Sequence, residues 1–179
     1  MKIKGLSLEN FAVTISDYLR INGIETVLTG GACVSIYTDN KYMSYDLDLI
    51  LMDVDKGKEA KELLITMGFY EEGRYFVHKD TEYFLDFLSP PPSVGSEPVK
   101  EIAELTKGDR KLYLLSPTDC VKDRLAAYYY WNDRQSLDQA ISVCVDNEVD
   151  LSEVERWSNI EGMNDKHKKF MAQLLKQKA

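Results

Sequence analysis

Hydrophobic residues in the first half of the chain follow helical spacing in some segments and strand spacing in others. In 8–22, Leu8, Phe11 and Ile15 lie on one side of a predicted helix, and Ser7 precedes them as a cap. Runs with an apolar residue at every second position predict strands. The expected elements are helix 8–22, strand 25–29, helix 32–37, strand 45–52, helix 56–67, a hairpin of 69–72 with 74–78, and strand 82–88.

The second half begins with a loop and ends in helices. Four of the five prolines fall in 89–98, and since proline cannot donate to a sheet, this pattern predicts a loop, one that could border a functional site. The elements expected after it are a hairpin of 101–106 with 110–115 and helices 117–131, 136–146, 152–159 and 165–176. The pattern therefore predicts the α/β (α+β) fold class, with a mixed-sheet lobe over 1–115 and a helical lobe over 116–179.

The composition is typical of a single globular module. The chain has 179 residues, of which 44% are hydrophobic and 29% charged, so it is long enough for one well-buried core. No apolar run approaches the ~20 residues that a membrane span needs. Ser7 and Glu9 interrupt the apolar residues at the start, which is unlike a secretory signal. We expect a cytoplasmic location and no contact with a membrane.

Charge and cysteine usage disfavour several kinds of site. The net charge of −8 disfavours binding to duplex DNA, and the C-terminal lysines alternate with apolar residues as on the wet side of a helix rather than in a nucleic-acid patch. Cys33, Cys120 and Cys144 are odd in number and widely spaced, which favours reduced core thiols over disulfides. With only His78 and His167 available, a zinc site is not expected.

Three aspartates interrupt otherwise apolar strand patterns. Asp46 and Asp48 alternate with leucines, so both project from the same face of the predicted strand, roughly 7 Å apart. Asp86 adds a third carboxylate from the strand 82–88. Ionised carboxylates in apolar strands are costly unless they are paired. The pattern therefore predicts a magnesium site with a phosphate ligand.

Nucleotidyl transfer is a reaction that needs such a site. A hydroxyl attacks the α-phosphorus of a nucleoside triphosphate and pyrophosphate leaves, so charge must be neutralised on both oxygens, and two Mg²⁺ ions do this. Asp46 and Asp48 would bridge the two metals. Asp86 would bind the metal that activates the hydroxyl and could accept its proton.

A glycine pair precedes the acidic strand. Gly30 and Gly31 lie between a predicted strand and a predicted helix, where the absence of side chains lets backbone N–H groups and the helix N-terminus approach a triphosphate. The chain contains no Walker A loop.

These motifs together resemble a known superfamily. Leu28-Thr29-Gly30-Gly31, then Ser44-Tyr45-Asp46-Leu47-Asp48, then Leu85-Asp86-Phe87 are similar to the three-part signature of the DNA polymerase beta-like nucleotidyltransferases. The resemblance implies their fold, a Mg²⁺-dependent transferase activity, and metal binding by Asp46, Asp48 and Asp86. It places Gly30, Gly31 and Ser44 at the nucleotide. A glycine stands here where the family commonly has a serine that touches phosphate.

The helical half is similar to small bacterial and archaeal members, including nucleotidyltransferase toxins of abortive-infection systems. In these relatives a helical lysine and nearby basic residues face the nucleotide phosphates, which implies this role for Lys122, with Arg124 and Arg134 as further candidates. Lys122 could instead pair with Asp119 or Asp123 on its own helix.

The sequence leaves the acceptor and the activity open. The acceptor could be a small molecule, a protein hydroxyl or an RNA end. A rival hypothesis is a catalytically silent protein that binds nucleotide or a protein partner, such as a toxin-antitoxin component. A metal-dependent phosphohydrolase, which would release phosphate without an acceptor, is a third hypothesis.

Overall fold

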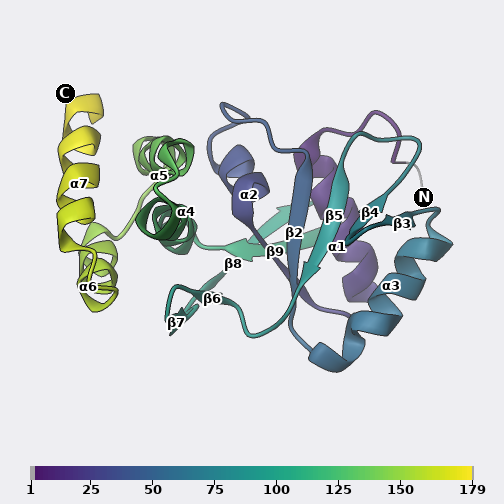
Figure 1. Ribbon diagram of the computed structural model, residues 1–179. Coiled ribbons are helices and arrows are strands. Elements are labelled where there is room, and N and C mark those ends of the chain that lie inside the picture. Colours follow the sequence, from purple (N-terminus) through teal and green to yellow (C-terminus); the bar gives the residue numbers. More distant parts are fainter. Residues whose placement is uncertain (1–2, 179) are drawn as a thin grey trace.

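The computed structural model describes residues 3–178, and the first part of the chain forms a seven-stranded mixed sheet (Figure 1). The sheet order is β3-β4-β5-β2-β1-β9-β8, in which β2 pairs with β5, and β1 with β9, in parallel, while the other pairs are antiparallel. The strands are β1 (Thr26–Thr29), β2 (Asp46–Leu51), β3 (Tyr70–Glu72), β4 (Tyr75–Val77), β5 (Phe84–Leu88), β8 (Ile102–Lys107) and β9 (Arg110–Leu115). The predicted mixed sheet is confirmed.

Three α-helices and one short 3-10 helix accompany the sheet. They are α1 (Leu8–Ile21), α2 (Gly30–Tyr37), η1 (Val54–Lys56) and α3 (Gly57–Thr66). Ser7 caps α1, as expected, because its Oγ accepts a hydrogen bond from the Asn10 N–H at 3.4 Å. In Figure 1, α2 lies between the sheet and the C-terminal helices, and α1 and α3 lie toward the opposite side.

Four helices follow within the part of the chain that the structure describes: α4 (Pro117–Trp131), α5 (Arg134–Asp146), α6 (Leu151–Ile160) and α7 (Asn164–Lys178). Their existence and order match the sequence prediction. Phe170 and Leu174 of α7 are buried whereas Lys168 is exposed, so the C-terminal lysines do include the wet side of a helix. Within residues 3–178, no helix is both long and apolar enough to cross a membrane.

The proline-rich segment differs from the expected loop. It contains two short paired strands, β6 (Ser93–Val94) and β7 (Glu97–Pro98), joined through Gly95, whose φ of +60° suits a tight turn. The segment packs against α6, where the Trp157 Nε1–H donates to the Val94 carbonyl oxygen at 3.2 Å. Its anchor is therefore the helical part of the chain.

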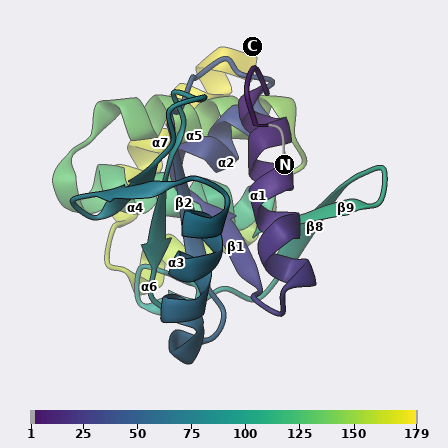
Figure 2. The same ribbon diagram turned by 90° about the vertical axis from the view of Figure 1, so that its right-hand side faces the viewer.

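A single buried cluster of apolar side chains connects the sheet with the C-terminal helices. Cys33, Cys120 and Cys144 belong to it as free, buried thiols, in agreement with the sequence prediction. In α6, the fully buried Trp157 stacks on Tyr129 of α4 with ring centroids 5.6 Å apart. Figure 2 shows β8 and β9 projecting from this packed body as an arm.

Candidate functional site

The three predicted acids lie on one face of the sheet. In β2, Asp46 and Asp48 are half-buried and alternate with fully buried leucines, so both carboxylates project away from the core. The parallel register of β2 and β5 places Asp48 opposite Asp86, and neighbouring residues of paired strands project to the same face. Asp86 is only 5% exposed. Residues separated by forty positions in the sequence therefore form one acidic group.

The electrostatics of this group affect Asp48 most. Burial, together with the negative charges of Asp46 and Asp86, raises the pKa of Asp48 to about 6, and Arg124 opposes the shift. Ser44 donates a hydrogen bond from its Oγ to Asp46 Oδ1 at 2.6 Å. Ser44, which the resemblance placed at the nucleotide, thus holds the Asp46 carboxylate in this structure.

The glycine pair lies directly against the acids. Gly30 has a φ of +70°, and a Cβ built on it would lie 2.3 Å from Asp48 Oδ2, so both the backbone and the space require glycine there. A Cβ on Gly31 would lie 3.1 Å from Ser44 Oγ. The helix α2 begins at Gly30 rather than at the expected residue 32, and the N-cap Thr29 makes no side-chain hydrogen bond. The first turn of α2 thus has N–H donors without a side-chain cap beside the acids.

The chain is similar to known proteins in its fold and not in its sequence. No protein-family model and no curated protein matches the chain. Solved structures do match. An antigenic nucleotidyltransferase-like protein from Paracoccidioides brasiliensis superimposes with a TM-score of 0.60 at 15% identity, over 76% of this chain and 74% of that one. ANT(2'')-Ia in complex with adenylyl-2''-tobramycin gives a TM-score of 0.54 at 14% identity, over 93% and 98%.

This chain has the nucleotidyltransferase fold. A solution structure of ANT(2'')-Ia, described as an antibiotic-resistance factor, agrees with a TM-score of 0.53 at 14% identity, over 92% of this chain and 95% of that one. The expected architecture, a mixed sheet followed by a helical region, is confirmed by these matches. At this identity, the likeness concerns the fold alone.

In this nucleotidyltransferase fold, α4 supplies the charged groups that act on the acids from the helical side. Arg124 donates from Nε and Nη2 to Asp123 Oδ2 at 3.0 and 2.5 Å. Burial lowers the pKa of Arg124. The nearby groups of Asp123, Cys120 and Asp48 raise this pKa by more, so that it is raised overall. Arg124 therefore remains a cation within the electrostatic influence of Asp48. Asp123, which the sequence analysis considered only as a partner of Lys122, also contributes negative charge to this surface.

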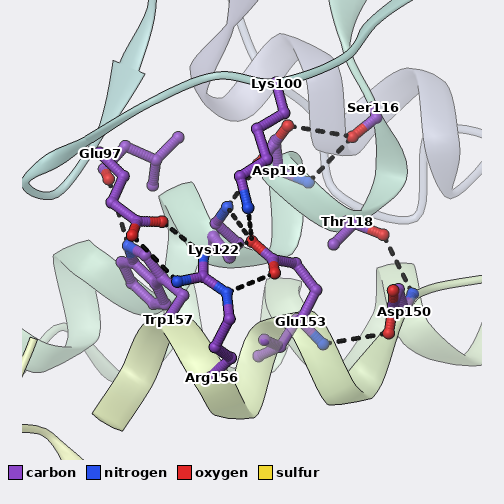
Figure 3. A network of polar contacts seen from close by, with 12 residues as sticks. Glu97, Lys100, Ser116, Thr118, Asp119, Lys122, Asp150, Glu153, Arg156 and Trp157 are labelled. Atoms are coloured by element: carbon purple, nitrogen blue, oxygen red, sulfur yellow. Dashed lines mark hydrogen bonds and ion pairs between the residues drawn. The ribbon is translucent and has the colours of Figure 1, made fainter. Parts of the chain in front are cut away.

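Lys122 makes the ion pair that the sequence offered as the alternative to a phosphate contact. It is 2% exposed, and its Nζ lies 2.8 Å from Asp119 and 3.4 Å from Glu153 of α6. Figure 3 shows Lys122 within a network that also contains Glu97 and Arg156. The ammonium group is thus held by carboxylates between α4 and α6, and we leave Lys122 out of the nucleotide site. The pairing with Asp119, which the sequence left open, is observed.

Arg134 also lies outside the acidic group. It is an exposed residue at the start of α5, where it borders a pocket of about 350 Å³ together with Tyr128, Asp138 and Lys169.

The proline-rich segment, which the sequence analysis expected could border a site, is anchored to α6 through Glu97, whose carboxylate accepts a hydrogen bond from Arg156 at 2.6 Å. Neither this segment nor Arg134 is part of the acidic group.

Arg74 is the residue that the sequence analysis missed. It lies in the two-residue turn between β3 and β4, and its Nη2 is 3.0 Å from Asp86 Oδ2. The Asp86 charge raises the pKa of Arg74, with smaller contributions from Tyr75 and Asp48. The antiparallel register of β4 and β5, with Phe76 opposite Leu85, brings the turn within reach of Asp86. No local sequence signal indicates this contact, because it depends on the order of the strands.

The acidic group fits magnesium by its chemistry. Carboxylate oxygens are the donors that Mg²⁺ prefers, and a cation would relieve the repulsion that acts on Asp48. Within residues 3–178, no three His, Cys, Asp or Glu side chains converge closely enough to hold one ion. Asp86 is engaged by Arg74 instead. A metal ion at all three acids would therefore require side-chain movements and the departure of Arg74.

Proposed function

We propose that this chain is a Mg²⁺-dependent nucleotidyltransferase that transfers a nucleoside monophosphate from a nucleoside triphosphate to a hydroxyl acceptor. The supporting observation is the common face of Asp46, Asp48 and Asp86, which lies against Gly30 at the start of α2. The nucleotidyltransferase fold adds support from an independent direction, because it comes from the path of the backbone rather than from the side chains.

Each residue of the site has a distinct task in this proposal. Asp46 and Asp48 would hold the magnesium ions, which when bound neutralise the charge on the entering and leaving oxygens. Asp86 would be a further ligand and would accept the proton of the attacking hydroxyl. The backbone N–H groups of the Gly30 turn and the guanidinium of Arg124 would bind the triphosphate.

The acceptor class is inferred from a protein of similar fold. The ANT(2'')-Ia structure contains adenylyl-2''-tobramycin, in which a small molecule carries the adenylyl group, and it matches this chain along nearly its whole length. A small-molecule hydroxyl is therefore the first acceptor class to test, before a protein hydroxyl or an RNA end.

The test is transfer of label in the presence of Mg²⁺. The protein is incubated with each α-³²P-labelled nucleoside triphosphate and a cell extract, beside an Asp46→Asn, Asp48→Asn variant and an Asp109→Asn control on the exposed β8–β9 turn. We expect label in an acceptor fraction with the wild type and the control, and none with the double variant. Labelled nucleoside diphosphate or monophosphate, with no label in any acceptor, would instead favour a phosphohydrolase.

The rival function is a catalytically silent protein that binds nucleotide or a protein partner, such as a toxin-antitoxin component. The ion pair of Arg74 with Asp86 is the observation that favours it, since this pair engages one of the three acids. If labelled nucleotide binds but no label is transferred with any triphosphate, the silent function replaces the transferase.

A further inference from the structure

Arg74 provides a positive charge for the acidic group from an exposed turn. Its side chain is 67% exposed, whereas the Asp86 side chain that it contacts at 3.0 Å is only 7% exposed. The guanidinium group approaches the buried carboxylate from the solvent side. Such a contact neutralises an acid that would otherwise be costly to keep ionised.

The turn is built to present this one side chain. Glu72 lies opposite Tyr75, so Gly73 and Arg74 form a two-residue turn, and Gly73 has a φ of +64° as such turns require. The guanidinium carbon lies 4.9 Å from the centroid of the Tyr75 ring, and this ring packs edge-on against Phe84 of β5. The guanidinium thus lies over a ring that packing holds in place, while the Arg74 side chain as a whole stays largely exposed to solvent.

The position of Arg74 is one that a cation would also occupy. Asp86 cannot give the same oxygen to a metal ion and to the guanidinium without rearrangement, so the two compete. A triphosphate at the Gly30 turn would offer the released guanidinium new anionic partners on the same face, because arginine binds phosphate oxygens well.

We propose that Arg74 occupies the cation position at Asp86 in the ligand-free protein and moves to the phosphates of the nucleotide when a divalent cation takes that carboxylate. This inference rests on the proposed function, since it assumes that the acids bind metal and nucleotide. The exchange makes the metal bind weakly alone and well together with the nucleotide. Arg74 then competes with the metal ion in the ligand-free protein, and it binds phosphate in the complex with metal and nucleotide.

The test is a pair of binding measurements on wild type and Arg74→Ala. Mn²⁺ alone is titrated, and free Mn²⁺ is followed by electron paramagnetic resonance. An ATP analogue with a methylene group between the α- and β-phosphorus is then titrated by calorimetry with Mn²⁺ present. We expect Arg74→Ala to bind Mn²⁺ alone on the order of threefold to tenfold more tightly than the wild type does. We expect it to bind the analogue more weakly than the wild type by a similar factor. Opposite signs are the signature of the exchange, because loss of structure would weaken both.

Two controls isolate the contact. Lys58→Ala removes one positive charge from an 87% exposed side chain on α3, and both affinities should stay at wild-type values. In an Asp86→Asn background, adding Arg74→Ala should leave the Mn²⁺ affinity unchanged. Equal Mn²⁺ affinities of wild type and Arg74→Ala, with binding still lost in Asp46→Asn, Asp48→Asn, would overturn the exchange and leave the proposed function standing. Absence of Mn²⁺ and analogue binding in every form would overturn both.

Discussion

Asp48 is a residue at which burial and neighbouring negative charges disfavour the ionised carboxylate that the proposed metal site needs. Its neighbours Asp46 and Asp86 are like charges, and burial removes much of the water that would screen them, so its pKa rises to about 6 from 3.8. A carboxyl group whose folded-state pKa is raised favours folding in its neutral form. Its contribution is present below pH 4 and is lost as the pH rises to about 6.

Asp48→Asn should therefore be more stable than the wild type at pH 7 in the absence of metal. We expect a gain of about 1 to 2 kcal/mol, reduced for solvent screening because the group is half-buried. Urea unfolding from pH 4 to 7 measures it. The gain should appear between pH 4 and 6 and stay constant above. A variant with a constant difference from wild type across this range would show that Asp48 is not perturbed.

Gly30 is constrained by both its backbone and its surroundings. Gly30→Ala adds a Cβ at a φ of +70° and at 2.3 Å from Asp48 Oδ2, so the carboxylate must move. We expect a loss of about 1 to 3 kcal/mol in the free energy of unfolding, together with loss of label transfer. Gly23→Ala is the matched control, since Gly23 has a φ of +80° and nothing within 4 Å of a built Cβ. Full transfer by Gly30→Ala would contradict the close approach proposed here.

At the scale of elements, α4 has two charged faces with different tasks. Lys122 pairs with Asp119 and Glu153 toward α6 (Figure 3). Arg124 and Asp123 instead influence the pKa of Asp48. Arg156, which binds Glu97 and Glu153, extends the first face to the β6–β7 hairpin. The network holds α4, α6 and the hairpin together, and the second face acts on the charge of Asp48.

Lys122→Ala and Arg124→Ala should separate these tasks. Lys122→Ala leaves the buried Asp119 without its partner, so we expect a loss of about 3 to 5 kcal/mol in stability while the folded protein keeps its nucleotide affinity. Arg124→Ala should lower nucleotide affinity by about tenfold with a smaller loss of stability. Thermal unfolding and calorimetric titration below the unfolding temperature measure both effects. The reverse result would restore Lys122 to the nucleotide site.

For the whole molecule, the proposed function predicts that ligand binding is coupled to stability. Mg²⁺ with a nucleoside triphosphate would bind only the folded chain, where β2, β5 and α2 meet, so it should raise the melting temperature by mass action. At about one hundred times the dissociation constant, we expect an increase of roughly 5 to 10 °C for a chain of this size. Differential scanning fluorimetry measures it, with Asp46→Asn, Asp48→Asn as the control that should not respond. A wild-type melting curve indifferent to both ligands would contradict the site.

The sequence alone determined the main helices and sheet strands, though not the β6–β7 hairpin, and it determined the acidic face within β2. Alternation of Asp46 and Asp48 with leucines is a local property of strand geometry, and the helix over 117–131 follows from Ser116-Pro117 and helical spacing. The Gly30-Gly31 turn is also a local pattern, lying between a predicted strand and a predicted helix, so the sequence alone could identify it.

Only the tertiary structure decided which charges meet. The parallel register that sets Asp48 opposite Asp86, and the strand order that brings Arg74 to Asp86, are relations between distant segments. Lys122 and Arg124 are two positions apart, yet one turns toward α6 and the other influences the acids, because residues two apart do not share a helix face. Local pattern determines which way a side chain can point within its own element, and packing determines what it meets there.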